Sequence, residues 1–310
     1  MTITQLNYVL AVAEEKNFTQ AAEKCFVTQP TLSMQIQKLE EELNIQLFDR
    51  TKKPIQPTPI GQKIIEQAQK IVSESSRISD IIEQQKGFIG GEFRIGIIPT
   101  VMPTLLPMFL QLFIKKYPKI NLIIEELTTQ ELVERLKKGK LDCAIAATPL
   151  EVETIQERPL YYEPFVVYTP DNHILATKNE IDVNELDFSE VLLLQDGHCF
   201  RDGILNLCQT SIDKEKANFQ LESGSFETLI KLVDEGLGIT LLPYLHTLDL
   251  THKKNCKEFK NPKPSREISL IYPKNELKKH IIEALYQTIQ SVVRGAIAFQ
   301  DVKIISPIKK

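Results

Sequence analysis

The stretch NFTQAAEKCFVTQPTLSMQIQKLEEELNIQLFDR, residues 17–50, contains a short helical pattern, a turn and a longer helical pattern. Asn17 or Thr19 can cap the first helix, and Thr28 can cap the second, which has Pro30 in its first turn. One apolar stripe runs along the second helix, formed by Leu32, Ile36, Leu39 and Leu43. Because a further helical pattern precedes this stretch, the sequence predicts a three-helix unit that fits helix-turn-helix geometry.

The face opposite this stripe carries side chains that can reach DNA bases and phosphates, namely Thr31, Met34, Gln35 and Lys38. Periodicity alone equally allows a three-helix bundle with a solvated polar face. Charge does not separate the two, since the net charge is −4 and acidic residues slightly outnumber basic ones in residues 1–58. DNA binding would therefore depend on where the charges lie, and not on bulk attraction.

The segment LFDRTKKPIQPTP, residues 47–59, is too rich in proline for a helix and long enough for a small β-wing. From Pro59 to about Ile89 a helical pattern runs almost without interruption. Its apolar face comprises Ile64, Ile65, Ala68, Ile71, Val72, Ile78 and Ile82. A single helix cannot bury such a face within itself, so we expect a partner helix, most simply from a second copy of the chain.

After Gly91 the pattern changes to strands that alternate with helices. Strands are predicted within residues 93–99, 120–126, 141–147, 164–170, 190–197, 239–243 and 266–273, and helices within 104–118, 128–139, 226–234 and 276–293. This alternation predicts an α/β domain with a parallel, doubly wound sheet. The tail SPIKK is expected to be loose.

A second motif is GHCFRD, residues 197–202, followed by Cys208. Cys199 is expected between a strand and a helix that begins near Asp202, where unpaired N–H groups favour a thiolate. A thiolate reacts with peroxide to give sulfenic acid, which a second thiol converts to a disulfide. The residues alone leave another interpretation open, in which both cysteines are small buried hydrophobes. A metal site with His198 lacks closely spaced companion ligands, and we expect no metal and no cofactor.

Helix geometry indicates how oxidation could act. If residues 199–208 were wholly helical, nine steps would separate the two cysteines by about 13 Å, on opposite faces. A disulfide needs Cα atoms within about 7 Å. The segment must therefore unwind or fold back, which Gly203 would ease, and a subunit interface could respond to that change.

Composition gives broad limits. The chain has 310 residues, 42% hydrophobic and 25% charged, with no Trp. The start MTITQLNYVL lacks the pattern of a signal peptide and no run is long enough for a membrane span, so we expect a cytoplasmic protein without a membrane partner. Its five cysteines should then be reduced by default. Cys25 is expected on a helix, Cys143 in an apolar strand and Cys256 in a polar loop, without assigned roles.

Residues 17–50 resemble the winged helix-turn-helix of LysR-type transcriptional regulators in their AA, QPTLS, LE..L and LF.R elements. The resemblance continues through a long linker helix into a regulatory domain like the periplasmic binding proteins. It implies a DNA-binding domain (1–58), a linker and dimerisation helix (59–90), a redox-sensing regulatory domain (91–300) and a tail (301–310). The regulatory domain would have one subdomain from 91–162 and 266–300, and another from 163–265.

This resemblance also implies partners and contacts. It implies homodimers joined through linker helices and paired into tetramers on one DNA operator, with RNA polymerase as a further partner. The residues expected at the major groove or its phosphates are Gln29, Pro30, Thr31, Ser33, Gln35 and Lys38. Arg50 in the wing is expected to enter the adjoining minor groove.

The GHCFRD motif with Cys208 resembles the peroxide-sensing OxyR branch of this family. The resemblance implies that Cys199 is the peroxidatic cysteine and Cys208 the resolving one, with hydrogen peroxide as signal and a thiol reductant as partner. It places the peroxide pocket among Thr100, Thr129, His198, Arg201, Asp202 and Arg266. The sequence departs from the pattern at Asn218, where histidine is familiar, and in two extra residues that follow it.

Two other functions remain to be compared with a peroxide sensor. In a metabolite-responsive regulator of the same family, Thr100 and Thr129 would bind a ligand carboxylate and the cysteines would be incidental. A thiol peroxidase is disfavoured, because an enzyme has no use for a winged helix and a long dimerising helix. The expected function is therefore regulation of transcription and not catalysis.

Overall fold

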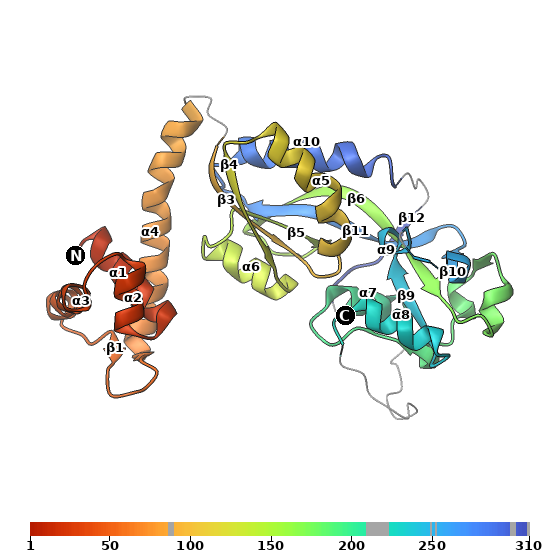
Figure 1. Ribbon diagram of the computed structural model, residues 1–310, viewed down its shortest axis with the longest axis horizontal. Helices are drawn as coiled ribbons and strands as arrows, with labels where there is room; N and C mark the ends of the chain where they lie inside the picture. The colour runs from red at the N-terminus through yellow and green to blue at the C-terminus, as the bar shows by residue number, and fades with distance from the viewer. Residues whose placement is uncertain (86–89, 209–222, 249, 252, 298–301, 309–310) are drawn as a thin grey trace. The chain divides into compact units, whose positions relative to one another are not determined.

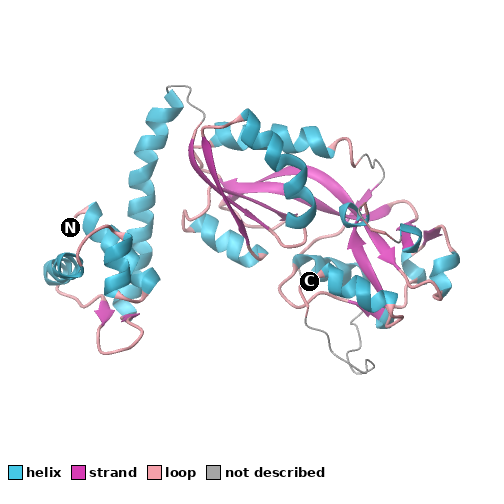
Figure 2. Ribbon diagram, viewed as in Figure 1, coloured by secondary structure: helices cyan, strands magenta, loops and turns pink. Residues whose placement is uncertain are grey.

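The computed structural model describes residues 1–85, 90–208, 223–248, 250–251, 253–297 and 302–308 (Figure 1). The chain divides into two units, Met1–Phe88 and Ile89–Lys310. Figure 2 shows helices and a small strand pair in the first unit, and a large sheet with helices in the second. No helix in the described ranges combines the length and apolarity needed to cross a membrane.

The first unit is a winged helix-turn-helix, as the sequence predicts. Its helices are α1 (Ile3–Glu15), α2 (Phe18–Lys24) and α3 (Gln29–Leu43). The Asn17 side chain accepts hydrogen bonds from the N–H groups of Thr19 and Gln20, so Asn17 is the cap of α2. Thr28 caps α3, and Leu32, Ile36 and Leu39 of the predicted stripe are buried, while Leu43 is partly buried. The wing pairs β1 (Phe48–Asp49) with β2 (Gln56–Pro57) in antiparallel register.

The long helix α4 (Pro59–Gln85) begins directly after the wing. Its first half packs on the core of the first unit, with Ala68 fully buried and Ile64 partly buried. Farther along, the Ile78 side chain is 61% exposed. The first half of α4 therefore buries its apolar face within the first unit, whereas Ile78 in the second half is exposed to solvent. The side chain of Ile82 lies outside the described residues.

The second unit contains a ten-stranded mixed sheet with the main order β4-β3-β5-β11-β6-β10-β7. Its strands are β3 (Gly91–Ile97), β4 (Ile120–Glu126), β5 (Cys143–Thr148), β6 (Ile155–Tyr168), β7 (Glu180–Ile181), β8 (Val191–Leu192), β9 (Ile239–Pro243), β10 (Cys256–Phe259), β11 (Lys263–Pro273) and β12 (Val302–Ile304). The α-helices are α5 (Met102–Lys116), α6 (Thr129–Lys137), α7 (Cys199–Cys208), α8 (Phe226–Asp234), α9 (Tyr244–Thr247) and α10 (Lys279–Val293). Together they form the predicted α/β fold.

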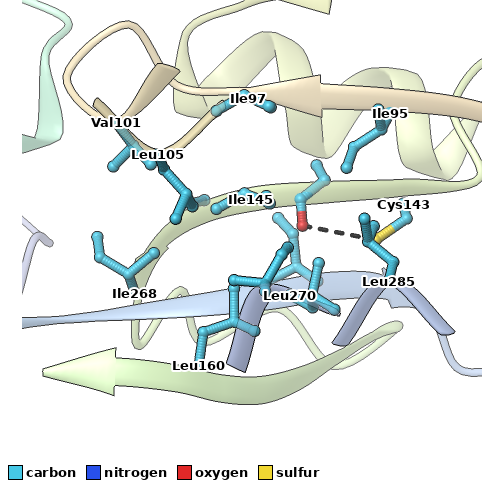
Figure 3. Packing of buried hydrophobic residues seen from close by; sticks show 14 of the residues in the cluster. Ile95, Ile97, Val101, Leu105, Cys143, Ile145, Leu160, Ile268, Leu270 and Leu285 are labelled. Carbon is cyan, nitrogen blue, oxygen red and sulfur yellow. Dashed lines mark hydrogen bonds between the residues drawn. The ribbon is translucent and has the colours of Figure 1, made fainter. Parts of the chain in front are cut away.

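Two hydrophobic cores lie on this sheet. One is built around β3, β5, α5 and α10, and Figure 3 shows Ile95, Cys143 and Leu285 within it. The other contains Phe165, Phe200 and Phe226 from β6, α7 and α8. The long strands β6 and β11 pair with each other from Ile155–Pro273 to Pro164–Ser265, and β6 contributes residues to both cores.

Three sequence predictions need correction. The sheet is not wholly parallel, because β6 and β11 run antiparallel to each other and β11 runs antiparallel to β5. Cys256 begins strand β10 and does not lie in a loop. The tail SPIKK is not loose at Ser306 and Ile308, because their carbonyls accept hydrogen bonds from the Asn206 side chain.

Candidate functional site

Cys199 is the first residue of α7, so this helix begins three positions before Asp202, where the sequence predicted its start. Gly197 precedes it with φ +92°, a left-handed conformation that side chains rarely adopt, and this turn brings the chain into the helix. Phe200 fixes the start of α7 through edge-to-face contacts with Phe165 and Phe226, at ring-centroid distances of 5.1 and 5.0 Å. Cys199 itself is 7% exposed.

Several groups act on the pKa of the Cys199 thiol. Burial raises this pKa above its usual value, and the charge of Asp202 adds to the rise. The Thr129 hydroxyl, the Arg266 charge and the Phe200 N–H oppose it. The sequence predicted an environment that favours thiolate; the favourable groups are present, but loss of water around the sulfur outweighs them. The resting thiol is therefore protonated.

Arg266 lies at the centre of a buried network beside this thiol. Its Nε and Nη2 donate to Oε2 of Glu163, at 2.9 and 2.7 Å. Its Nη1 donates to Oγ1 of Thr100 at 2.8 Å, and Nη2 also donates to the Thr100 carbonyl at 3.0 Å. The guanidinium carbon lies 5.1 Å from the centroid of the Phe200 ring. The cation is thus fixed beside the residue that follows Cys199.

The Glu163 carboxylate was not anticipated from the sequence. It faces Arg266 directly across the β6–β11 pair, and its Oε1 accepts the N–H of Leu245 at 2.9 Å. Glu163 is 1% exposed and Arg266 is 3% exposed. The available signal was a glutamate inside the apolar run LYYEPFVVY, residues 160–168, because a buried carboxylate requires a partner.

Thr129 places a hydroxyl near the Cys199 thiol. It is the first residue of α6, and its Oγ1 is buried. No described atom meets hydrogen-bonding geometry with this Oγ1, although the hydroxyl lies close enough to the Cys199 thiol to lower its pKa. The contact with sulfur is therefore long or poorly directed, and the hydroxyl retains hydrogen-bonding capacity for a small polar molecule.

The remaining predicted pocket residues differ in placement. His198 is 8% exposed, and burial lowers its pKa, opposed by Glu126, so its imidazole is neutral at neutral pH. Arg201 donates from Nη1 to the Leu194 carbonyl at 2.8 Å, and its Nε lies 2.8 Å from Oδ1 of Asp196. Arg201 therefore binds its own loop, whereas Thr129 and Arg266 act on the thiol and Thr100 is bound to Arg266. Asn218 lies outside the described residues.

Cys208 ends α7, and its side chain lies outside the described part of the chain. Since α7 has ten residues, nine helical steps separate it from Cys199, about 13 Å along the axis. A direct disulfide is thus incompatible with an intact α7. Among the described residues, no three His, Cys, Asp or Glu side chains cluster as a metal site would require.

The predicted DNA-contacting residues of α3 all lie outside its buried stripe. Gln29, Pro30, Thr31 and Lys38 are exposed, and Ser33 and Gln35 are at least partly exposed. Gln35 is oriented by the buried Gln5, whose Nε2 donates to it at 3.3 Å. The exposed part of α3 therefore carries hydroxyl, amide and ammonium groups, which can contact bases and phosphates.

Arg50 follows β1 and lies against α3. Its Nη2 is 2.9 Å from Oε2 of Glu40, and its guanidinium carbon is 5.1 Å from the centroid of the Phe18 ring. The side chain is still 42% exposed. Two exposed cations that the sequence prediction omitted, Lys52 and Lys53, also lie in the wing, and the doubled lysine before Pro54 was the signal for them.

Comparisons with known proteins cover both units. Residues 3–62 match the family model for bacterial regulatory helix-turn-helix proteins of the lysR family, and residues 86–294 match the LysR substrate binding domain. A hydrogen peroxide-inducible genes activator from Haemophilus influenzae is 36% identical over 301 residues, which cover 95% of this chain and 99% of the relative. The transcriptional dual regulator OxyR of Escherichia coli is 35% identical, with coverage of 95% and 97%.

Solved structures agree with this assignment. A full-length OxyR variant from Pseudomonas aeruginosa has a TM-score of 0.77 at 34% identity, covering 94% of this chain and 98% of that one. A hydrogen-peroxide-bound OxyR mutant from Corynebacterium glutamicum has a TM-score of 0.64 at 30% identity, covering 95% and 93%. With family models spanning both units and relatives matched over almost their whole length, the chain belongs to the LysR family of helix-turn-helix regulators.

Proposed function

We propose that this LysR-family protein is a DNA-binding transcription regulator that senses hydrogen peroxide through Cys199 and Cys208. The observation that carries the proposal is the placement of the Cys199 thiol at the start of α7, with Thr129 and the buried Arg266 acting on it. The names of its relatives, hydrogen peroxide-inducible genes activators, support the same signal.

The reaction begins with loss of the thiol proton, which Arg266 and Thr129 favour. The Cys199 sulfur then attacks one peroxide oxygen, the O–O bond breaks, and the departing hydroxide takes up a proton to leave as water. Thr100 and Thr129 can hold the peroxide by donating and accepting hydrogen bonds. Asp202 can organise the proton, directly or through water. The product is Cys199 sulfenic acid.

The second step couples this chemistry to structure. The Cys208 thiol attacks the sulfenic sulfur, the S–O bond breaks, and a second water leaves as the disulfide forms. Because intact α7 holds the cysteines too far apart, the step requires that helix to unwind. A cellular dithiol returns the pair to its reduced form by exchange.

The output of the switch is exerted on DNA. In this proposal residues 1–58 bind the operator, α4 joins two copies, and residues 91–300 sense the signal. Two dimers form a tetramer on the operator and RNA polymerase is the downstream partner, in the cytoplasm. The regulatory subdomains would be 91–162 with 266–300, and 163–265. Exposed Ile78 on α4 supports pairing with a second helix.

Mass spectrometry of the cysteines before and after one equivalent of hydrogen peroxide tests the proposal. We expect one intramolecular Cys199–Cys208 disulfide per chain, with no continued peroxide turnover when thioredoxin is supplied in catalytic amounts. Sustained turnover at an enzymatic rate would favour a thiol peroxidase. Unmodified cysteines would favour a metabolite-responsive regulator.

The rate of the peroxide reaction should rise with pH, by about tenfold per unit below the pKa of Cys199, because only thiolate reacts. Asp202→Asn should move this profile to lower pH, since the Asp202 charge raises that pKa. Thr129→Val should move it to higher pH, since the Thr129 hydroxyl lowers that pKa. Stopped-flow rates between about pH 5 and 10 measure both shifts, and movement of both profiles in one direction would contradict this electrostatic account.

Arg50→Gln should weaken operator binding several-fold and reduce its dependence on salt by about one counterion. The matched control is Arg94→Gln, because Arg94 is equally exposed and paired with Glu92 but lies in the second unit. Fluorescence anisotropy with labelled operator at several salt concentrations gives both quantities. The peroxide rate should be unchanged in both variants; a simultaneous loss in Arg50→Gln would indicate a folding defect instead.

A further inference from the structure

The C-terminal segment 302–308 connects two elements of the second unit. On one side β12 pairs in parallel with the start of β11, and the Ile305 N–H donates to the Ser265 carbonyl at 2.8 Å. Ser265 is adjacent to Arg266 in the chain. On the other side the segment meets α7 (Figures 1 and 2). The segment therefore joins the strand of Arg266 to the helix of Cys199.

The two hydrogen bonds from α7 to this segment come from one side chain, that of Asn206. The Asn206 amide donates from Nδ2 to the Ser306 carbonyl at 2.8 Å and to the Ile308 carbonyl at 2.7 Å. Its two donors are thus both used by the tail. The Ile308 N–H donates in turn to Oγ of Ser306 at 3.2 Å, which holds this short turn in the shape that the amide binds.

Apolar packing supports the same attachment. Ile305 from the tail and Leu207 from α7 both belong to the second hydrophobic core, and they are 8% and 7% exposed. Asn206 and Leu207 are adjacent, so the polar and apolar contacts both act on the last turn of α7. The tail consequently binds the half of α7 that ends in Cys208.

We propose that residues 302–308 form a strap that stabilises α7 in its helical, dithiol form and thereby raises the reduction potential of the Cys199–Cys208 pair. The inference rests on the proposed function. Disulfide formation requires α7 to unwind, which displaces Asn206 from the two tail carbonyls. Contacts present only in the dithiol form favour that form. The strap therefore makes the disulfide easier to reduce and the oxidation of Cys199 and Cys208 to a disulfide less favourable.

Asn206→Ala tests the strap, because the effect expected from losing the strap is opposite to the effect of alanine on the helix itself. Loss of two hydrogen bonds should shift the equilibrium toward the disulfide by about tenfold, which is about 30 mV for a two-electron couple. Alanine forms helices better than asparagine, so the effect of this substitution on α7 alone would shift the equilibrium the opposite way. The measurement is the fraction of Cys199–Cys208 disulfide at equilibrium in buffers of reduced and oxidised dithiothreitol, on the full chain.

A second variant ends the chain before Val302 and leaves α7 untouched. It should show an equal or larger shift toward the disulfide, and adding Asn206→Ala to it should give no further shift in that direction. The rate at which Cys199 reacts with peroxide should stay at the parental value in Asn206→Ala, because the strap binds the far end of α7.

An Asn206→Ala chain whose disulfide is no more stable than the parental one would overturn the strap, whether or not the shortened chain folds. The same shift from Asn206→Ala with and without the tail would also overturn it, because Asn206 would then act through the helix alone. A parental chain that forms no Cys199–Cys208 disulfide in these buffers would remove the proposed function, and the strap with it.

Discussion

Replacing Cys199 with serine is expected to abolish the fast reaction with hydrogen peroxide, leaving the slow background of the remaining thiols. A serine hydroxyl is not appreciably ionised near neutral pH and is weakly nucleophilic without an activating base, so it cannot attack the O–O bond at a useful rate. Competition for peroxide against a thiol of known rate, followed by mass spectrometry, measures the loss.

Two further substitutions test whether the loss is specific to Cys199. Cys208→Ser should keep the first step and let Cys199 sulfenic acid accumulate, which a 1,3-diketone reagent traps. Cys256→Ser is the matched control, because burial raises the pKa of Cys256 to about 11 and keeps that thiol unreactive. If the Cys199→Ser chain consumed peroxide at the parental rate, the assignment of the reactive thiol would be wrong.

Glu163→Ala is expected to lower the free energy of unfolding by about 3–5 kcal/mol. The Arg266 guanidinium is buried, and Glu163 accepts two of its hydrogen bonds. Without the carboxylate, the buried Arg266 cation loses its counter-charge and the Leu245 N–H loses its acceptor. Urea unfolding of the full chain, followed by circular dichroism, measures the change.

The double variant Glu163→Leu with Arg266→Met separates stability from reactivity. Replacing both charges together removes the desolvation cost, so most of the lost stability should return. Peroxide reactivity at neutral pH should nevertheless fall below that of the parental chain, because the Arg266 charge that lowers the pKa of Cys199 is gone. A loss below about 1 kcal/mol in Glu163→Ala would mean that the pair is solvated.

Sequence patterns were sufficient to predict the elements whose local sequence preferences agree with their tertiary contacts. Thr28 and Pro30 mark the start of α3, and the spacing of Leu32 to Leu39 determines its buried face, so the helix-turn-helix follows from capping and periodicity. The GHC motif likewise marks the turn that leads into α7. These features depend on residues a few positions apart, where local interactions dominate.

Long-range features could not be predicted in the same way. Glu163 and Arg266 are separated by 103 positions, and only the register of β6 with β11 brings them together. Arg201 belongs to the predicted pocket by position, yet its side chain binds the Leu194 carbonyl. The tail SPIKK was expected to be loose because the side chain that binds it, Asn206, lies 100 positions back in the chain. Each depends on tertiary context that periodicity does not contain.

The continuous pairing of β6 with β11 has a mechanical consequence. A hinge between lobes works when the connecting strands can bend freely. Here the connection is formed by β6 and β11, which are hydrogen-bonded to each other with one irregularity, between Ile268 and Ser269. Near one end of this pairing, the Glu163–Arg266 ion pair joins the two strands. Such a paired connection should resist bending between the two hydrophobic cores. If α7 unwinds as proposed, we expect this paired connection to bend little, so that the change is passed to the surface beside α7.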